Sequence, residues 1–371
     1  MSAGQRLFDF SLKNAKWVAL VGVTYILLGG LLLPLKPGLV DLDQQSIISN
    51  KAYTITATTY GLPKDAVINR VVFQGYRDAA RKNLFYWVSD KPAVYQDQKI
   101  NFSAQLKLGE AKVKDQDLNV FVEYNNGKWM FLPAAIFMNR AANDTTGKTQ
   151  LVSTILNANF EHKMFEMSFP NRVTLNESVR NLFYHVPMWF SMLALLAMGM
   201  LFGIKYLNSG DLKYEMRFDA LIRVGILAGI LGCITGATWA RVTWGSWWPK
   251  EDPKLNGVAI GMLMYFAYLI LRSTMSDPHQ RARISAIYSV FIFPIFVALI
   301  AIMPKLAAHS LHPGSGDSVG FNQYDLDSTM RLFFWPAVMS WIALFWWIHN
   351  ILFKIKSLEE INLDKEILDN N

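Results

Sequence analysis

The residues best suited to binding chemistry lie in one short stretch after an apolar run. It reads Trp244-Gly245-Ser246-Trp247-Trp248-Pro249-Lys250-Glu251-Asp252-Pro253-Lys254. Tryptophan is common where a membrane span meets water, so an aromatic belt alone would explain two or three of these rings. It does not explain so many flat rings beside a glycine, two acids and a lysine. Rings offer a broad apolar surface and glycine lets the backbone approach closely, so the stretch predicts a site for a planar ligand.

The six histidines divide by their position relative to the apolar runs. Three fall on the same side as the tryptophans: His185, His309 and His312. The other three lie in a long polar segment or toward the opposite side: His162, His279 and His349. A single histidine at a membrane edge often only hydrogen-bonds to a carbonyl. Two histidine-bearing elements beside a tryptophan surface favour heme, because imidazole is a common axial ligand of its iron.

Membrane-spanning helices must position these residues. Hydrophobic residues make up 52% and charged residues 18% of the 371 residues. A run of about 18 or more apolar residues is needed to cross a hydrocarbon core of roughly 30 Å. Runs that approach this length are Trp17–Leu35, Val186–Leu207, Ala220–Trp239, Val258–Leu271, Ile284–Met303 and Leu332–Phe353. We therefore expect an α-helical polytopic membrane protein of about six transmembrane helices, the fourth short and the first a retained anchor.

The net charge of +7 reflects topology rather than nucleic-acid binding. Basic residues gather before the first run, in alternate links and after the last run: Arg6, Lys13, Lys16, Lys205, Lys213, Arg217, Arg223, Arg272, Arg281, Arg283, Lys354, Lys356 and Lys365. All fall on one side if six spans are threaded in order, and the positive-inside rule makes that side the cytoplasm. Both termini are then cytoplasmic, and the tryptophans face outward.

A segment between the first two runs has a β pattern. Alternation occurs in Tyr53–Thr59, Val67–Phe73, Phe85–Val88, Ile100–Leu108, Leu118–Tyr124 and Trp129–Phe131. Turn residues separate these stretches at Gly61-Leu62-Pro63, Lys91-Pro92 and Asn125-Asn126-Gly127. Short strands at this spacing predict a small sandwich or barrel outside the membrane. It holds no evident ligand constellation, so we expect docking or stability as its role.

Cys233 is the one cysteine, which excludes a CxxCH heme-attachment site in this chain and a disulfide framework. It lies inside the third apolar run and is interpreted as a small apolar packing residue.

From about Asn176 to Lys356 the sequence resembles the CcmC type of heme-handling proteins of cytochrome c biogenesis, which carry a tryptophan-rich WWD motif. The stretches that carry the resemblance are Asn176–Pro187, with its His-Val-Pro, Thr235–Ala240 followed by Trp244–Trp248, and Leu311-His312-Pro313-Gly314-Ser315. Their order along the chain also agrees. The β-rich segment is absent from the familiar short members, so the resemblance says nothing about it.

The resemblance implies residue roles. His185 and His312 correspond to the heme-iron ligands; Trp244, Trp247 and Trp248 correspond to the aromatic platform; Asp252 and Lys254 match the ends of the motif. Arg180, Arg241 and Lys254 are candidate propionate partners. Two choices stay open. Glu251 competes with Asp252 because the acid comes one position later than usual, and His309 competes with His312.

The predicted organisation has four parts. Residues 1–36 form the N-terminal segment and first span, 37–175 the extracytoplasmic β-rich domain, 176–356 the heme-handling membrane domain and 357–371 a cytoplasmic tail. No catalytic residues are expected. The resemblance implies a multi-pass protein of the bacterial inner membrane that binds heme b non-covalently and transiently and presents it to a periplasmic heme chaperone. Its implied partners are ABC transporter subunits of cytochrome c maturation and membrane lipid, with no nucleic acid.

Two alternatives remain. One is a heme lyase or synthase component that attaches heme to apocytochrome. The other is a transporter or channel unrelated to heme, which predicts ionisable residues within several spans; apart from Arg223 and His349 few are evident.

Overall fold

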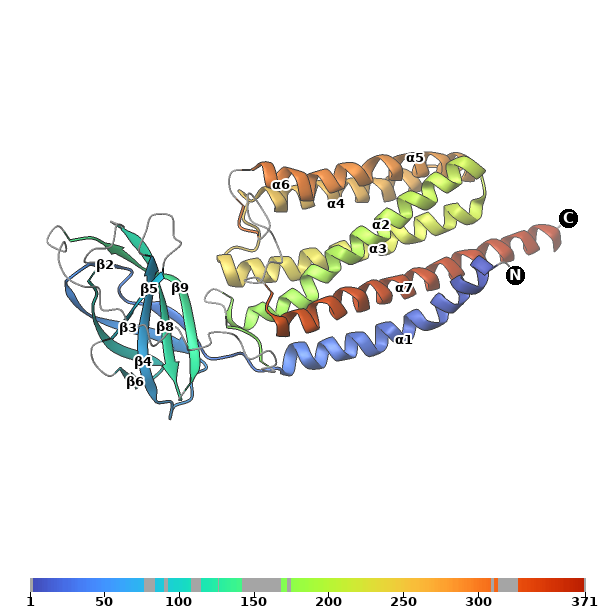
Figure 1. Cartoon of the computed structure of the whole chain (residues 1–371). Coiled ribbons are helices and arrows are strands. Elements are labelled where there is room, and N and C mark those ends of the chain that lie inside the picture. The colour runs from blue at the N-terminus through green and yellow to red at the C-terminus, as the bar shows by residue number, and fades with distance from the viewer. Residues whose placement is uncertain are drawn as a thin grey trace. The chain divides into compact units, whose positions relative to one another are not determined.

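The computed structural model describes residues 3–76, 84–89, 93–107, 115–125, 127–141, 168–171, 175–307, 310–312 and 326–369. Its long helices are α1 (Ala3–Leu32), α2 (Leu182–Ser209), α3 (Leu212–Trp244), α4 (Pro253–Ser273), α5 (Pro278–Val297) and α7 (Ser328–Asp369), drawn in Figure 1. Short turns complete the helical part: η2 (Asn176–Asn181) before α2, then a π-helical turn η3 (Ala298–Ile302) and α6 (Met303–Leu306) after α5. The chain divides into two compact units, 1–33 with 178–371, and 34–177.

Within the described residues, six helical segments are long and apolar enough to cross a membrane. They are Asn14–Leu32, Asn176–Ser209, Leu212–Trp244, Pro253–Ser273, Pro278–Leu306 and Ser328–Asn362. The predicted multi-pass architecture is confirmed, and the β-rich segment follows the first helix. The fourth span is longer than its apolar run, because Asp252 caps α4 and Pro253 occupies its first turn. Since α7 continues to Asp369, most of residues 357–371 extend that helix.

The β-rich unit is a sandwich of two sheets among the residues described. One has the order β1-β3-β7-β6 and the other β2-β9-β8-β4-β5. The bounds are β1 Gly38–Leu42, β2 Ser46–Ile48, β3 Ala52–Tyr60, β4 Ile68–Tyr76, β5 Leu84–Val88, β6 Val94–Gln96, β7 Lys99–Gln105, β8 Gln116–Tyr124 and β9 Lys128–Asn139. The inward residues of both sheets form one core, in which Phe73 meets Phe102 with ring centroids 5.9 Å apart. Of the two predicted architectures, a sandwich or a barrel, the structure has the sandwich. His162 and Lys91-Pro92 lie outside the described residues.

A row of glycines on α3 receives the side chains of α2. A Cβ at Gly225 would come within 2.9 Å of Leu196, and one at Gly232 within 2.9 Å of Trp189. Glycines at such contacts let two helices approach closely. Gly236 continues the row toward the end of α3 and faces His185, so helix packing and the candidate site share one surface.

The outer helices pack by similar contacts. In α1, a Cβ at Gly29 would overlap Phe333 of α7 at 2.0 Å, and the ring of Tyr25 stacks on Phe333 at 5.0 Å. In α4, Gly261 faces the ring of Phe296, and a Cβ at Gly257 would lie 2.4 Å from the Leu299 carbonyl oxygen. These contacts hold α4 against α5 and η3.

Candidate functional site

The tryptophan-rich stretch joins α3 to α4, but its first part is helical. Helix α3 extends through Arg241 to Trp244, five residues beyond its apolar run, and ends where Gly245 adopts a φ of +74°. Glycine favours this left-handed conformation, which ends helices. Arg241 Nη1 donates to the Gly245 carbonyl oxygen and reinforces the end. The platform loop, residues 245–252, therefore begins at a fixed point.

His185 lies in the first turn of α2 with its ring against α3. Its Nδ1 is 3.1 Å from the Gly232 carbonyl oxygen and 3.2 Å from Thr235 Oγ1, whose hydroxyl donates to the Leu231 carbonyl. A carbonyl oxygen only accepts, so Nδ1 carries the hydrogen in the neutral ring. Nε2 then holds the lone pair that can bind a metal ion.

Aromatic rings and a glycine fix the orientation of the His185 ring. Trp239 approaches its edge at a centroid distance of 5.8 Å and Trp189 at 6.1 Å, both nearly perpendicular. A Cβ at Gly236 would lie 2.6 Å from Cε1 of the histidine. Only a residue without a side chain leaves this space for the ring.

His312 faces the start of α4. Its Nδ1 is 3.2 Å from Asp252 Oδ1, and its ring lies edge-on to Trp244 at 5.0 Å. The two atoms are within ion-pair distance, but the ring N–H does not meet the full geometry of a hydrogen bond. The carboxylate accepts only, so its position favours the hydrogen on Nδ1 and the lone pair on Nε2, as in His185.

Asp252 connects the platform loop, α4 and the His312 segment. Oδ2 accepts from the Leu311 amide at 2.8 Å and from Ser310 Oγ at 3.0 Å. Oδ1 accepts from the amides of Lys254 and Leu255 and caps α4. Burial alone would raise the pKa of Asp252, but His312 and the Leu311 amide hold the pKa well below its usual range.

Asp252 and Glu251, the two candidates for the acid of the motif, differ in their surroundings. Asp252 is 3% exposed and makes the contacts described above, whereas the side chain of Glu251 is exposed. His309 lies outside the described residues, so the choice between His309 and His312 as the iron ligand depends on the heme spectra of their alanine variants.

The two histidine regions come together in the helical unit. His185 lies close enough to both His312 and Lys254 to interact with them electrostatically. The site thus brings residues from the start of α2, the start of α4 and the segment before α7 to the same end of the bundle.

The three platform tryptophans differ in their surroundings. Trp247 is 58% exposed, and Trp248 is half-buried against the core of the helical unit. Trp244 is half-buried beside His312. Trp247 is therefore the most accessible of the three rings.

Arg180 is held by the first helix. Its Nη1 donates to the Gly30 carbonyl oxygen of α1 at 2.8 Å. Lys254, another predicted cation, interacts electrostatically with both His185 and Asp252.

Sequence reasoning missed three residues that shape the site. Trp189 follows His185 by four positions, a spacing that places both on one helix face. Trp239 and Gly236 were part of the family-like stretch, but their contact with His185 depends on how α2 and α3 pack. The i, i+4 spacing was a readable signal for Trp189 only.

The family model for CcmC, described as "Heme exporter protein C", matches residues 134–366. Two proteins with that name are similar to the chain. The Rhodobacter capsulatus protein is 24% identical over 196 residues, covering 52% of this chain and 76% of that protein. The Paracoccus denitrificans protein is 25% identical over 164 residues, covering 42% of this chain and 67% of that protein.

A shorter similarity extends to proteins named "Cytochrome c biogenesis protein CcsA". The Prochlorococcus marinus protein of strain SARG is 42% identical over 74 residues, 20% of this chain and 23% of that protein. The family match is broader, since it includes every described residue of the candidate site. The chain belongs to the CcmC family of heme exporter proteins.

Proposed function

We propose that this chain binds heme non-covalently, with His185 and His312 as the two axial ligands of the iron. One observation carries the proposal: each imidazole presents Nδ1 to an acceptor, Gly232 in one case and Asp252 in the other. Each Nε2 is then the available lone pair. This is the arrangement expected of metal-binding histidines, whose second nitrogen is held by a carbonyl or carboxylate.

The tryptophans and Lys254 suit the rest of the heme. When bound, heme supplies an iron with two axial positions in a flat apolar ring that bears two carboxylates. The exposed ring of Trp247 and the ring of Trp244 beside His312 offer apolar contact. Lys254 offers a cation for a propionate. Asp252 contacts the His312 segment, so we assign it a positioning role rather than contact with the heme.

We further propose that the site faces the periplasm of a bacterial inner membrane. The basic residues support this orientation, since those in the α2–α3 and α4–α5 links and at both termini fall on one side of six threaded spans. The β-rich unit is then extracytoplasmic, and both termini are cytoplasmic. Reporter fusions at residue 250 and at the C terminus would contradict this topology if both report the same side.

The heme-handling role follows from the family and from the site together. The named relatives are heme exporter proteins. We propose that this chain presents heme to a periplasmic heme chaperone and works with ABC transporter subunits, forming no covalent bond itself. The exposure of Trp247, which is 58%, suits release of the heme.

The test is a transfer assay. The purified protein in lipid nanodiscs is loaded with heme and mixed with the apo-form of the heme chaperone, and both fractions are then measured for heme. We expect heme to move to the chaperone from the wild type. A wild-type protein that retains no heme after the loading step would contradict the proposal.

The CcsA similarity supports a second candidate, direct attachment of heme to apocytochrome. Its discriminating assay supplies a CxxCH peptide in place of the chaperone and looks for heme that survives acid-acetone extraction. Extraction-resistant heme that depends on this chain would favour attachment, and fully extractable heme would favour the handling role.

A further inference from the structure

Helices α3 and α4 form a hairpin whose tip is the platform loop, residues 245–252. Trp244 ends one arm and Asp252 caps the other, so the separation of the arms determines the shape of the loop between them. The far ends of the two arms form the base of the hairpin.

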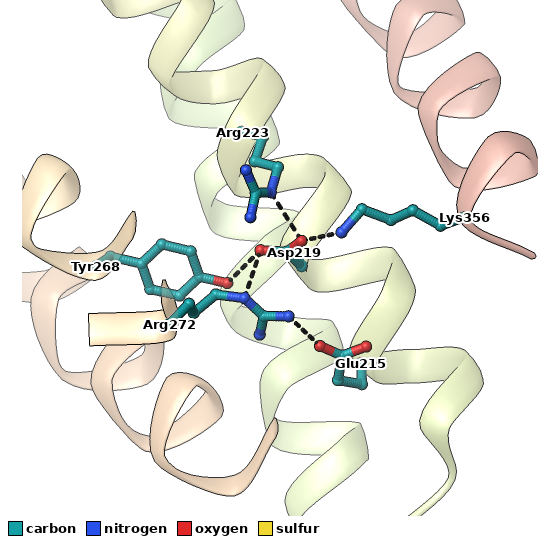
Figure 2. Close-up of polar contacts among 6 residues, drawn as sticks. All are labelled: Glu215, Asp219, Arg223, Tyr268, Arg272 and Lys356. Atoms are coloured by element: carbon teal, nitrogen blue, oxygen red, sulfur yellow. Dashed lines mark hydrogen bonds and ion pairs between the residues drawn. The ribbon is translucent and has the colours of Figure 1, made fainter. Parts of the chain in front are cut away.

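The base is held by a buried polar cluster that sequence reasoning did not identify. Figure 2 shows Asp219 of α3 at its centre. Asp219 is fully buried, and its Oδ1 accepts from Tyr268 of α4 at 3.0 Å and lies 3.0 Å from Arg272 Nε of the same helix. Arg272 Nη2 also pairs with Glu215, one turn earlier on α3. These four residues, Glu215, Asp219, Tyr268 and Arg272, are named the base clamp.

Two further cations contact Asp219 without joining the arms of the hairpin. Arg223 Nε donates to Oδ2 at 2.9 Å and lies four residues later on the same helix. Lys356 of α7 pairs with the same oxygen and joins α3 to α7. The cluster thus contains separate links from Asp219 to α4, to α7 and within α3, as the dashed lines in Figure 2 show.

The depth of the cluster favours a clamp over an ion path. With a rise of 1.5 Å per residue, α3 is about 50 Å long, which exceeds the roughly 30 Å of a hydrocarbon core. Asp219 lies about two turns from the start of α3, and Arg272 lies one residue before the end of α4. The charges therefore lie toward one membrane surface, whereas ion or proton pathways continue through the midplane.

The middle of the hairpin is packed by a more adaptable contact. A Cβ at Gly229 of α3 would meet the sulfur of Met262 of α4 at 2.7 Å. A thioether on a flexible side chain adjusts to small shifts, but a buried ion pair requires defined distances and angles. The base clamp is therefore the directional contact between the arms.

We infer that the base clamp sets the spread of the α3/α4 hairpin and thereby positions the platform loop and Asp252 at the opposite membrane surface. Because α4 is about 30 Å long, a tilt of about 3° at the base displaces its tip by about 1.5 Å. Such a displacement exceeds the tolerance of about 0.5 Å within which a ligand site must hold its side chains. By linkage, heme bound at the tip also favours the clamped base.

The inference rests on the proposed heme site, so its test includes a measurement without heme. Spin labels are placed on cysteines at Val242 and Ile260, which are 67% and 50% exposed near the tips of α3 and α4, with Cys233 replaced by alanine. Pulsed EPR then gives the distance between the arms. Tyr268→Phe removes one clamp hydrogen bond and keeps the ring, and Arg223→Gln is the matched control that changes only the link within α3.

We expect Tyr268→Phe to shift or broaden the distance distribution and to weaken heme binding about 5- to 30-fold, with a melting temperature close to that of Arg223→Gln. Arg223→Gln and Lys356→Met should keep the wild-type distribution and affinity. Arg272→Lys, which keeps the charge but loses the fork that reaches both acids, should reproduce Tyr268→Phe.

An unchanged distance distribution in both Tyr268→Phe and Arg272→Lys would overturn the clamp, whatever happens to heme. Equal effects in Arg223→Gln would also overturn it, because a general loss of charge balance would then explain the result. If the clamp variants change the distance between the arms but the wild type binds no heme, the result would instead contradict the proposed function.

Discussion

Gly236→Ala is the sharpest test of the way the helices position His185. The added Cβ would lie 2.6 Å from Cε1, and ordinary contact begins near 3.4 Å, so the ring must retreat by about 0.8 Å. The ring is bonded through Nδ1 to Gly232 at 3.1 Å and flanked by Trp189 and Trp239. A retreat of that size breaks or greatly lengthens the hydrogen bond.

Two opposing effects determine the magnitude. Alanine in a helix interior is favoured over glycine by about 1 kcal/mol. Overpacking costs about 1–3 kcal/mol, so the net loss of folding stability is about 0–2 kcal/mol. The effect on heme is separate: a lost hydrogen bond of about 0.5–1.5 kcal/mol weakens His185 as a ligand and corresponds to roughly a 2- to 12-fold lower affinity.

The assay titrates heme into Gly236→Ala and into Gly229→Ala, and records melting temperature in parallel. Gly229 lies on the same row, but its Cβ would meet the flexible ends of Met192 and Met262. We expect weaker heme binding in Gly236→Ala and near wild-type binding in Gly229→Ala. Wild-type affinity and spectrum in Gly236→Ala, or equal weakening in both, would refute the packing argument.

Further predictions concern the acid, the platform and the β unit. Asp252→Ala should lower folding stability by about 1 kcal/mol through the lost helix cap and should disturb the heme spectrum, while Glu251→Gln should do neither in melting and absorption measurements. Because the folded pKa of Asp252 lies below its ordinary value near 3.9, its stabilising contribution is full above that value and is lost as the pH falls; melting of Asp252→Asn should therefore depend less on pH between about 5 and 3. Trp247→Ala should speed heme dissociation with little change in melting, and Trp248→Ala should lower both retention and melting temperature. Phe73→Ala should destabilise the sandwich by about 3–5 kcal/mol without removing heme from the bundle, and complete heme loss from a folded bundle would argue against the separate role of the sandwich.

The long helices were predictable because their apolar runs are continuous, but their ends were not. The predicted first run included Leu35, whereas α1 ends at Leu32 shortly before Pro34. Helix α3 extends past its apolar run through Arg241 and Thr243, because the residue that ends the helix is Gly245. In the sandwich, the short strands β1, β2 and β6 were not predicted.

The residues of the candidate site could be predicted from the sequence, but their contacts could not. Residue types and family-like context pointed to His185, His312 and Asp252, while the polar partners of the two histidines come from distant parts of the chain and have no local sequence signal. The Asp219–Arg223 pair has a readable i, i+4 spacing. Its links to Tyr268, Arg272 and Lys356 depend on tertiary packing.

Ligation of heme iron by His185 and His312 is tested by the visible absorption spectrum of the purified protein with ferric heme. The spectrum is compared among wild type, His185→Ala, His312→Ala and the double variant. We expect a low-spin six-coordinate spectrum for the wild type. Each single variant should lose that spectrum while the tryptophans retain some heme, and the double variant should show no axial ligation by these imidazoles. His309→Ala is the internal control and should leave the spectrum unchanged. A low-spin spectrum that persists in the double variant, or one that depends on His309 and not on His312, would contradict the assignment.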